Sequence, residues 1–238
     1  MTRTTRAVAA LLAALAAVGA TAALVLAGGG EAATPHASQH AAAPHHQMHP
    51  TSAKPTAAEA AFSAEMRRLW LEHVEWTRLA IADVASGSPA VKATLARLLR
   101  NQTDLGNAIK PYYGNAAGRK LTGLLREHIL IAVDVLQAAK AGKTAAVTRG
   151  EARWNANADQ IAAFLSSANP KHWPPAALKS MMREHLALTL KEAVAHLKGR
   201  WAASVRAADE VEHAMLHMSD ALTAGIVAQF PQRFGHDA

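Results

Sequence analysis

From Thr56 to Phe230, apolar residues recur at spacings of three and four, and Gly or Pro separates six such stretches. This spacing places the apolar residues of each stretch on one side of an α-helix. We therefore expect helices at residues 57–86, 89–110, 115–141, 144–168, 175–199 and 201–229. Gly142 and Gly199 stand where helix C-caps are expected. The sequence predicts an all-α fold, a six-helix bundle similar to a four-helix bundle.

The composition excludes several classes of protein. The chain has 238 residues and no Cys, which excludes disulfides, thiolate metal sites and cysteine catalysis. Its formal charge is +7, but no basic run is interleaved with aromatic residues, so nucleic acid is not an expected partner. The charge favours instead a mildly basic surface that faces an anionic cell envelope.

The N-terminal part of the chain differs from the rest. Residues 1–27 have a basic start and a long apolar stretch, which predicts a signal peptide or an N-terminal membrane anchor. Residues 28–56 lack periodicity and are typical of a disordered linker, and residues 57–238 form the predicted bundle domain. We therefore expect an extracytoplasmic protein, secreted or attached to the envelope. The linker is expected to be either a spacer or a tract that binds metal loosely. The second interpretation depends on its histidines: His36, His40, His45, His46 and His49.

An internal repeat links two of the predicted helices. LTGLLREHILIAVDVLQAAKAGK (121–143) aligns without a gap with LKSMMREHLALTLKEAVAHLKGR (178–200), so that His128 meets His185 and Gly142 meets Gly199. The duplication of a helical hairpin would explain this match. Chance similarity between two helices rich in Leu and Ala is the alternative.

Each predicted helix also carries a polar residue on its apolar face. Because an unpaired buried polar group costs a few kcal/mol, so many inward polar side chains suggest a shared polar centre. Three imidazoles and nearby carboxylates from facing helices are the groups from which bundle metal sites are built. The expected metal ligands are His73, His128, His185, Glu192, Glu212 and His196, and the supporting polar residues are Gln102, Asn101, Asn157 and Thr189.

The metal at such a centre would be a divalent transition metal, Zn, Cu or Fe. A metal-free polar network, or a pocket for a small molecule, explains the same residues. The paired Glu-x-x-His motif of di-iron proteins is absent at both Arg-Glu-His triplets. The flank of the last helix suggests a second, weaker metal site, formed by Asp209, His213, His217 and Asp220. The alternative for these residues is a solvated surface.

These patterns favour binding over catalysis, because no pair of nucleophile and base is recognisable. We expect an exported protein that binds a metal ion or a small molecule at a buried His, Glu and amide centre. One alternative is a metal-dependent hydrolase or redox enzyme that uses the same centre, with a glutamate as general base. The other is a structural envelope protein whose buried polar network holds no ligand.

Long motifs suggest a relationship: LWLEHVEWTRLAI (69–81), LLRNQTDLGNAIKPYYG (98–114), RWNANADQIAAFL (153–165), MMREHLALTLKEAVAHL (181–197) and MSDALTAGIVAQFPQRF (218–234). Over residues 60–235 the chain resembles a group of uncharacterised helical-bundle proteins from Bacillus-like and other soil bacteria. Members often carry automatic names such as glycosyltransferase or acetylglutamate kinase, but this chain has no Rossmann pattern and no phosphate loop. The resemblance implies a helical bundle and assigns characteristic positions to His73, Trp76, Thr77, Arg78, Asn101, Asp104, His128, Trp154, Asn157, Asp159, His185, Thr189, Glu192, Asp209, Glu212, Asp220, Gln229 and Phe230.

Overall fold

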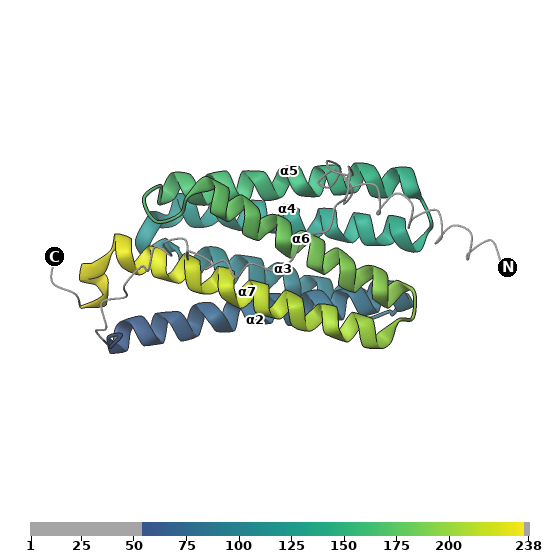
Figure 1. Ribbon diagram of the computed structural model, residues 1–238, viewed down its shortest axis with the longest axis horizontal. Helices are drawn as coiled ribbons and strands as arrows, with labels where there is room; N and C mark the ends of the chain where they lie inside the picture. The colour runs from purple at the N-terminus through teal and green to yellow at the C-terminus, as the bar shows by residue number, and fades with distance from the viewer. Residues whose placement is uncertain (1–53, 236–238) are drawn as a thin grey trace, which may run out of the picture.

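The computed structural model describes residues 54–235, and these residues form six α-helices and one short 3-10 helix (Figure 1). The helices are α2 (Ala57–Ser86), α3 (Val91–Ala108), α4 (Lys110–Lys140), α5 (Thr144–Ala168), α6 (Pro175–Leu197) and α7 (Trp201–Gln229), and the 3-10 helix η1 spans Pro231–Phe234. The prediction of an all-α bundle is confirmed. None of these helices is long and apolar enough to span a bilayer within the described part of the chain.

Neighbouring helices run antiparallel and pack side by side in chain order, and α7 returns to pack on α2 (Figure 1). The six helices therefore form a closed ring around one core. Thr56 begins this ring with a capping box: its hydroxyl accepts from the Glu59 amide, and its own amide donates to the Glu59 carboxylate. The Thr56 hydroxyl also donates to the carbonyl of Phe234 at 2.7 Å, so the start of α2 contacts the 3-10 helix η1.

Helix α4 begins earlier than its sequence suggests. The sequence predicts a break from Lys110 to Gly114, but residues 110–113 form a helical turn, and only Gly114 leaves the helical conformation, at φ 82°. The turn is held because Tyr112 stacks on Phe234, and the Tyr113 hydroxyl donates to Gln229 at 2.6 Å. Tertiary contacts thus extend a helix across a sequence that locally favours a turn.

The helical hairpin is repeated three times. The dipeptide Glu-His occurs at 72–73, 127–128 and 184–185, on α2, α4 and α6, and in these three copies a glycine of positive φ follows the His by 14 residues, at positions 87, 142 and 199. A fourth Glu-His, at 212–213 on α7, has no such glycine. The turns at Gly142 and Gly199 make the same pair of backbone hydrogen bonds, which close a Schellman motif. The two-copy repeat seen in the sequence therefore extends to a third hairpin, α2–α3.

Candidate functional site

The three predicted histidines lie together in one layer at the centre of the ring. His73, His128 and His185 are each at most 4% exposed. The ring centroids of His73 and His185 are 5.8 Å apart, and those of His128 and His185 are 6.1 Å apart. His185 of α6 thus lies between the other two histidines. Sequence reasoning correctly placed all three side chains in the interior.

His128 is fixed by hydrogen bonds at both ring nitrogens. The indole Nε1–H of Trp154 donates to His128 Nε2 at 3.1 Å, and because indole is only a donor, Nε2 must carry a lone pair. The proton is therefore on Nδ1, which donates to Asn157 Oδ1 at 2.8 Å. The Asn157 amide then donates to the carbonyl of Leu124, one turn before His128. Both partners come from α5.

His73 is held in a similar way by α3. Gln102 Nε2 lies 3.2 Å from His73 Nδ1 and also donates to the Leu98 carbonyl and to Asn101 Oδ1. Because an amide nitrogen donates and does not accept, Gln102 can bond to His73 Nδ1 only as the donor, and its two protons are shared among three neighbouring atoms. Asn101 in turn donates to the carbonyl of Leu69, one turn before His73. The amide side chain follows its histidine by 29 residues in both hairpins.

The third histidine lacks this amide partner. Position 214, which is 29 residues after His185, is Ala, and the next residue is Met215. His185 Nδ1 is buried and has no hydrogen-bond partner among the described residues. His73 and His128 each have a side-chain amide as hydrogen-bond partner and His185 has none, because α7 carries no amide where α3 and α5 carry one.

All three histidines are neutral at physiological pH. Burial lowers the pKa of His73 to about 3 and that of His128 to about 4, against an ordinary value of 6.5. The neighbouring His128 lowers the pKa of His73 further, and the Gln102 hydrogen bond opposes this. Burial also holds the pKa of His185 well below its ordinary value, and proximity to His73 and His128 adds to the effect. Neutral imidazoles are consistent with the fixed tautomer of His128.

The buried polar stripe continues along α6 beyond His185. Thr189 and Glu192 follow at spacings of four and three, and they are 5% and 2% exposed. Neither Thr189 Oγ1 nor Glu192 Oε1 has a hydrogen-bond partner among the described residues. The nearest cation, at 3.9 Å, is Nε of Arg78, whose side chain is half exposed. Burial raises the pKa of Glu192 to about 7 in spite of Arg78, which lowers it.

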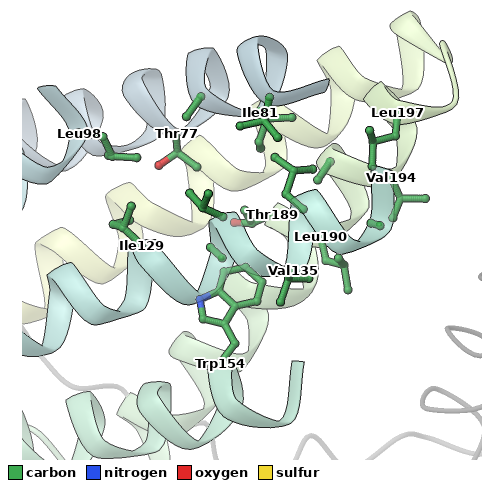
Figure 2. A pocket seen from close by; sticks show the side chains of 17 residues that line it. Thr77, Ile81, Leu98, Ile129, Val135, Trp154, Thr189, Leu190, Val194 and Leu197 are labelled. Atoms are coloured by element: carbon green, nitrogen blue, oxygen red, sulfur yellow. The ribbon is translucent and has the colours of Figure 1, made fainter. Parts of the chain in front are cut away.

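An apolar cavity lies one turn along the helices from the histidine layer (Figure 2). Its volume is about 50 Å³. Thr77, four residues after His73, and Thr189, four residues after His185, are the two threonines of its wall, and Trp154 reaches it from α5. The Thr77 hydroxyl is also buried and unpaired. The other lining residues are Ala80, Ile81, Val84, Leu98, Ile129, Ala132, Val133, Val135, Leu136, Ala139, Leu190, Ala193, Val194 and Leu197.

Several other predicted ligands do not reach this centre. The prediction that Glu212 lies on the core face is wrong: Glu212 is exposed, because the buried face of α7 runs through Ala208, Val211 and Met215. His196 is half-buried and lies away from the layer, edge-on to Trp201 and 3.4 Å from the Ser204 hydroxyl.

The weaker metal site on α7 is an open surface. Asp209, His213 and His217 are exposed, and Asp220 is paired with Arg67 of α2. This arrangement is the solvated surface that was the alternative for these residues. The predicted linker ligands, His36, His40, His45, His46 and His49, lie outside the described residues.

A three-histidine metal site does not fit the geometry of the layer. A metal ligand must offer a lone pair, but the only lone pair of His128 accepts the Trp154 hydrogen bond. His73 Nδ1 already faces the Gln102 amide. Between residues 54 and 235, no group of three or more His, Asp or Glu side chains is arranged to hold a metal ion.

Sequence reasoning missed Trp154 as the partner of His128 and Thr77 as a wall of the cavity. Nothing in the spacing of Trp154 indicates the direction of its indole nitrogen. Thr77 carried a usable signal, because it stands four residues after His73 as Thr189 stands four residues after His185.

No family model, no curated protein and no solved structure matches the chain. The resemblance to the helical-bundle group of soil bacteria therefore stays a prediction.

Proposed function

We propose that the protein binds a small, mainly apolar molecule that carries at least one hydrogen-bonding group, in the cavity beside α6. One observation carries this proposal: unpaired buried polar atoms lie beside unfilled apolar space. These atoms are Thr77 Oγ1 on α2 and Thr189 Oγ1 on α6, and both residues line the cavity. Each costs about 1–3 kcal/mol when it is left without a partner, so a ligand that pairs with them gains that free energy.

The cavity limits the size of this ligand. One water molecule needs roughly 10–15 Å³ of such space, so the 50 Å³ open to water centres has room for only a few non-hydrogen atoms. Apart from Thr77 and Thr189, the wall is aliphatic or indole. A short aliphatic alcohol or amine matches an apolar wall that contains two threonines (Figure 2).

The site favours binding rather than chemistry. Catalysis by a hydroxyl requires a base within hydrogen-bond reach, about 2.6–3.2 Å. The hydroxyls of Thr77 and Thr189 have no such partner among the described residues. The imidazole of His128 is already bonded at both nitrogens.

Ligand binding is tested by thermal unfolding of the full chain with short alcohols, amines and alkanes of matched size. We expect the alcohols or amines to raise the melting temperature. At a ligand concentration a hundredfold above Kd, binding adds about 3 kcal/mol to the unfolding free energy. Ala193→Leu, which fills the wall of the cavity, should abolish the shift. Thr189→Val keeps the shape and should reduce the shift for alcohols but not for alkanes.

Two results would count against the proposal. One is a set of probes that leaves the melting temperature unchanged. The other is a shift that persists unchanged in Ala193→Leu, because the ligand would then bind outside the cavity.

A metal ion is the second candidate, favoured by the unpaired His185 Nδ1 and by the 5.8 Å separation of the His185 and His73 ring centroids. Metal content is measured on a full chain in which the five linker histidines are replaced by Ser, so that only the bundle can bind. If the bundle holds Zn, Cu or Fe, His185→Ala should lose it and His217→Ala, an exposed control, should keep it. Absence of metal from the starting chain would eliminate this candidate.

A further inference from the structure

The turns at one end of the bundle carry more cations than acids. Because the helices alternate in direction, the turns α2–α3, α4–α5 and α6–α7 lie at the same end (Figure 1). Residues 84–96, 135–150 and 193–208, which we call the basic end, contain no Asp or Glu. Their cations are Lys92, Lys140, Lys143, Arg149, Lys198, Arg200 and Arg206.

These cations are not neutralised within the described fold. None of the seven takes part in an ion pair with another residue between 54 and 235. All are exposed except Lys198, which is half-buried. The acids that border the segments, one residue outside them, are Asp83, Asp134, Glu151, Glu192 and Asp209. Asp83 accepts a hydrogen bond from the Thr94 hydroxyl, Asp134 pairs with Arg153, and Glu192 is buried near Arg78.

Two large apolar side chains are exposed among these cations. Trp201, the first residue of α7, is 62% exposed, and Val205, one turn later on the same face, is 46% exposed. Arg200 and Arg206 flank the pair in sequence. Trp favours the boundary between lipid and water, because its ring is apolar and its N–H is polar.

We propose that the basic end docks on an anionic lipid bilayer, with Trp201 and Val205 entering the interface and the cations contacting headgroup phosphates. An excess of cations beside exposed apolar side chains is the pattern of surfaces that bind such membranes. Nucleic acid would satisfy the cations and could stack on Trp201, but it offers no apolar surface for Val205. The inference concerns a surface of the protein and does not depend on the identity of the ligand in the cavity.

The geometry provides an internal control for a test. Helix α6 has 23 residues, so its two ends are separated by roughly 34 Å at 1.5 Å per residue. The chain has no Cys, so a single introduced Cys can carry a fluorophore. Ala202 at the basic end and Ala176 at the start of α6 are both exposed and give matched sites.

The full chains Ala202→Cys and Ala176→Cys, each labelled, are mixed with vesicles that contain a nitroxide headgroup lipid. We expect the label at 202 to be quenched about twofold more than the label at 176 on phosphatidylglycerol vesicles, and not on phosphatidylcholine vesicles. Insertion of the N-terminal apolar stretch would bring both labels to the same membrane, so the difference between them is the readout. Equal quenching at both sites, or none at 202, would overturn the proposal.

Charge reversal gives a second test. Lys143→Glu, Arg200→Glu and Arg206→Glu together should remove the excess quenching at 202, whereas Arg119→Glu, Lys171→Glu and Lys179→Glu change the net charge equally at the opposite end and should preserve it. Duplex DNA is added in place of vesicles as the competing partner. Binding to DNA without excess quenching on anionic vesicles would mean that the surface serves nucleic acid and that the proposal is wrong.

Discussion

Residues of the same type contribute differently to the histidine layer, according to the hydrogen bonds that each one makes. His128 holds the Trp154 indole and the Asn157 amide, whereas His185 leaves Nδ1 unpaired. His128→Leu should therefore cost about 2–4 kcal/mol of unfolding free energy, because it strands two buried polar groups. His185→Leu should cost less than about 1 kcal/mol or stabilise the fold, because it removes an unpaired nitrogen. Urea unfolding of both variants measures this difference, and equal losses would contradict it.

Glu192 makes a prediction about pH at the same scale. Its pKa is raised to about 7, above the ordinary 4.5, so the folded state resists its ionisation, and this residue costs stability as pH rises from 4.5 through 7. Glu192→Gln should leave the unfolding free energy unchanged at low pH and raise it by about 2 kcal/mol near pH 8. This gain is smaller than the whole pKa shift would give at about 1.36 kcal/mol for each pKa unit, because solvent at Arg78 screens the charge. Chemical unfolding at the two pH values measures this, and the same effect at both would show that ionisation is not the cause.

At the scale of elements, the contact between α3 and α4 depends on two glycines. A Cβ on Gly118 would lie 2.6 Å from the carbonyl oxygen of Gly106, and the reverse contact is also 2.6 Å. Gly118→Ala should therefore separate the helices and cost about 1–3 kcal/mol. Gly123→Ala, in the same helix with nothing within 4 Å, should stabilise by about 0.5–1 kcal/mol. Thermal unfolding compares the two, and a stabilising Gly118→Ala would mean that the helices pack less closely than described.

Sequence periodicity could predict the helices but not every side-chain direction. Most predicted boundaries agree with the structure because Gly and Pro mark them, as at Gly87 and Pro175. The burial of His73, His128 and His185 followed from the same periodicity. Glu212 was misplaced because it is four residues after buried Ala208, and spacing alone does not decide whether the buried face continues through 211 or 212. The cavity was not predictable, because it depends on how six helices fill the space between them.

At the scale of the molecule, three buried neutral imidazoles predict acid unfolding. Each histidine has a pKa of 6.5 when unfolded and a much lower one when folded, so stability is lost as pH falls below 6.5. The loss from His128 alone is about 3 kcal/mol at its folded pKa, from 1.36 kcal/mol per unit. Glu192 opposes this with a smaller gain. Because folded domains are stable by only about 5–15 kcal/mol, we expect cooperative unfolding before about pH 4.

Circular dichroism during an acid titration measures this transition. His217→Leu, which removes an exposed histidine, should leave its midpoint unchanged, whereas His73→Leu should move it to lower pH if the variant folds. A wild-type chain that retains its full helical signal well below pH 4 would contradict the prediction.

The closure of the ring by α7 on α2 has a consequence for the order of the chain. Thr56 and Phe234 are joined by a hydrogen bond although 178 residues separate them, so a short peptide can bridge the ends of the bundle. The packing of the ring would be the same if the two termini lay at another turn instead of between α7 and α2. A circular permutant of residues 56–235 that begins after Gly142 should adopt the same ring, and α5, an interior helix in the natural order, would then be the first to leave the ribosome.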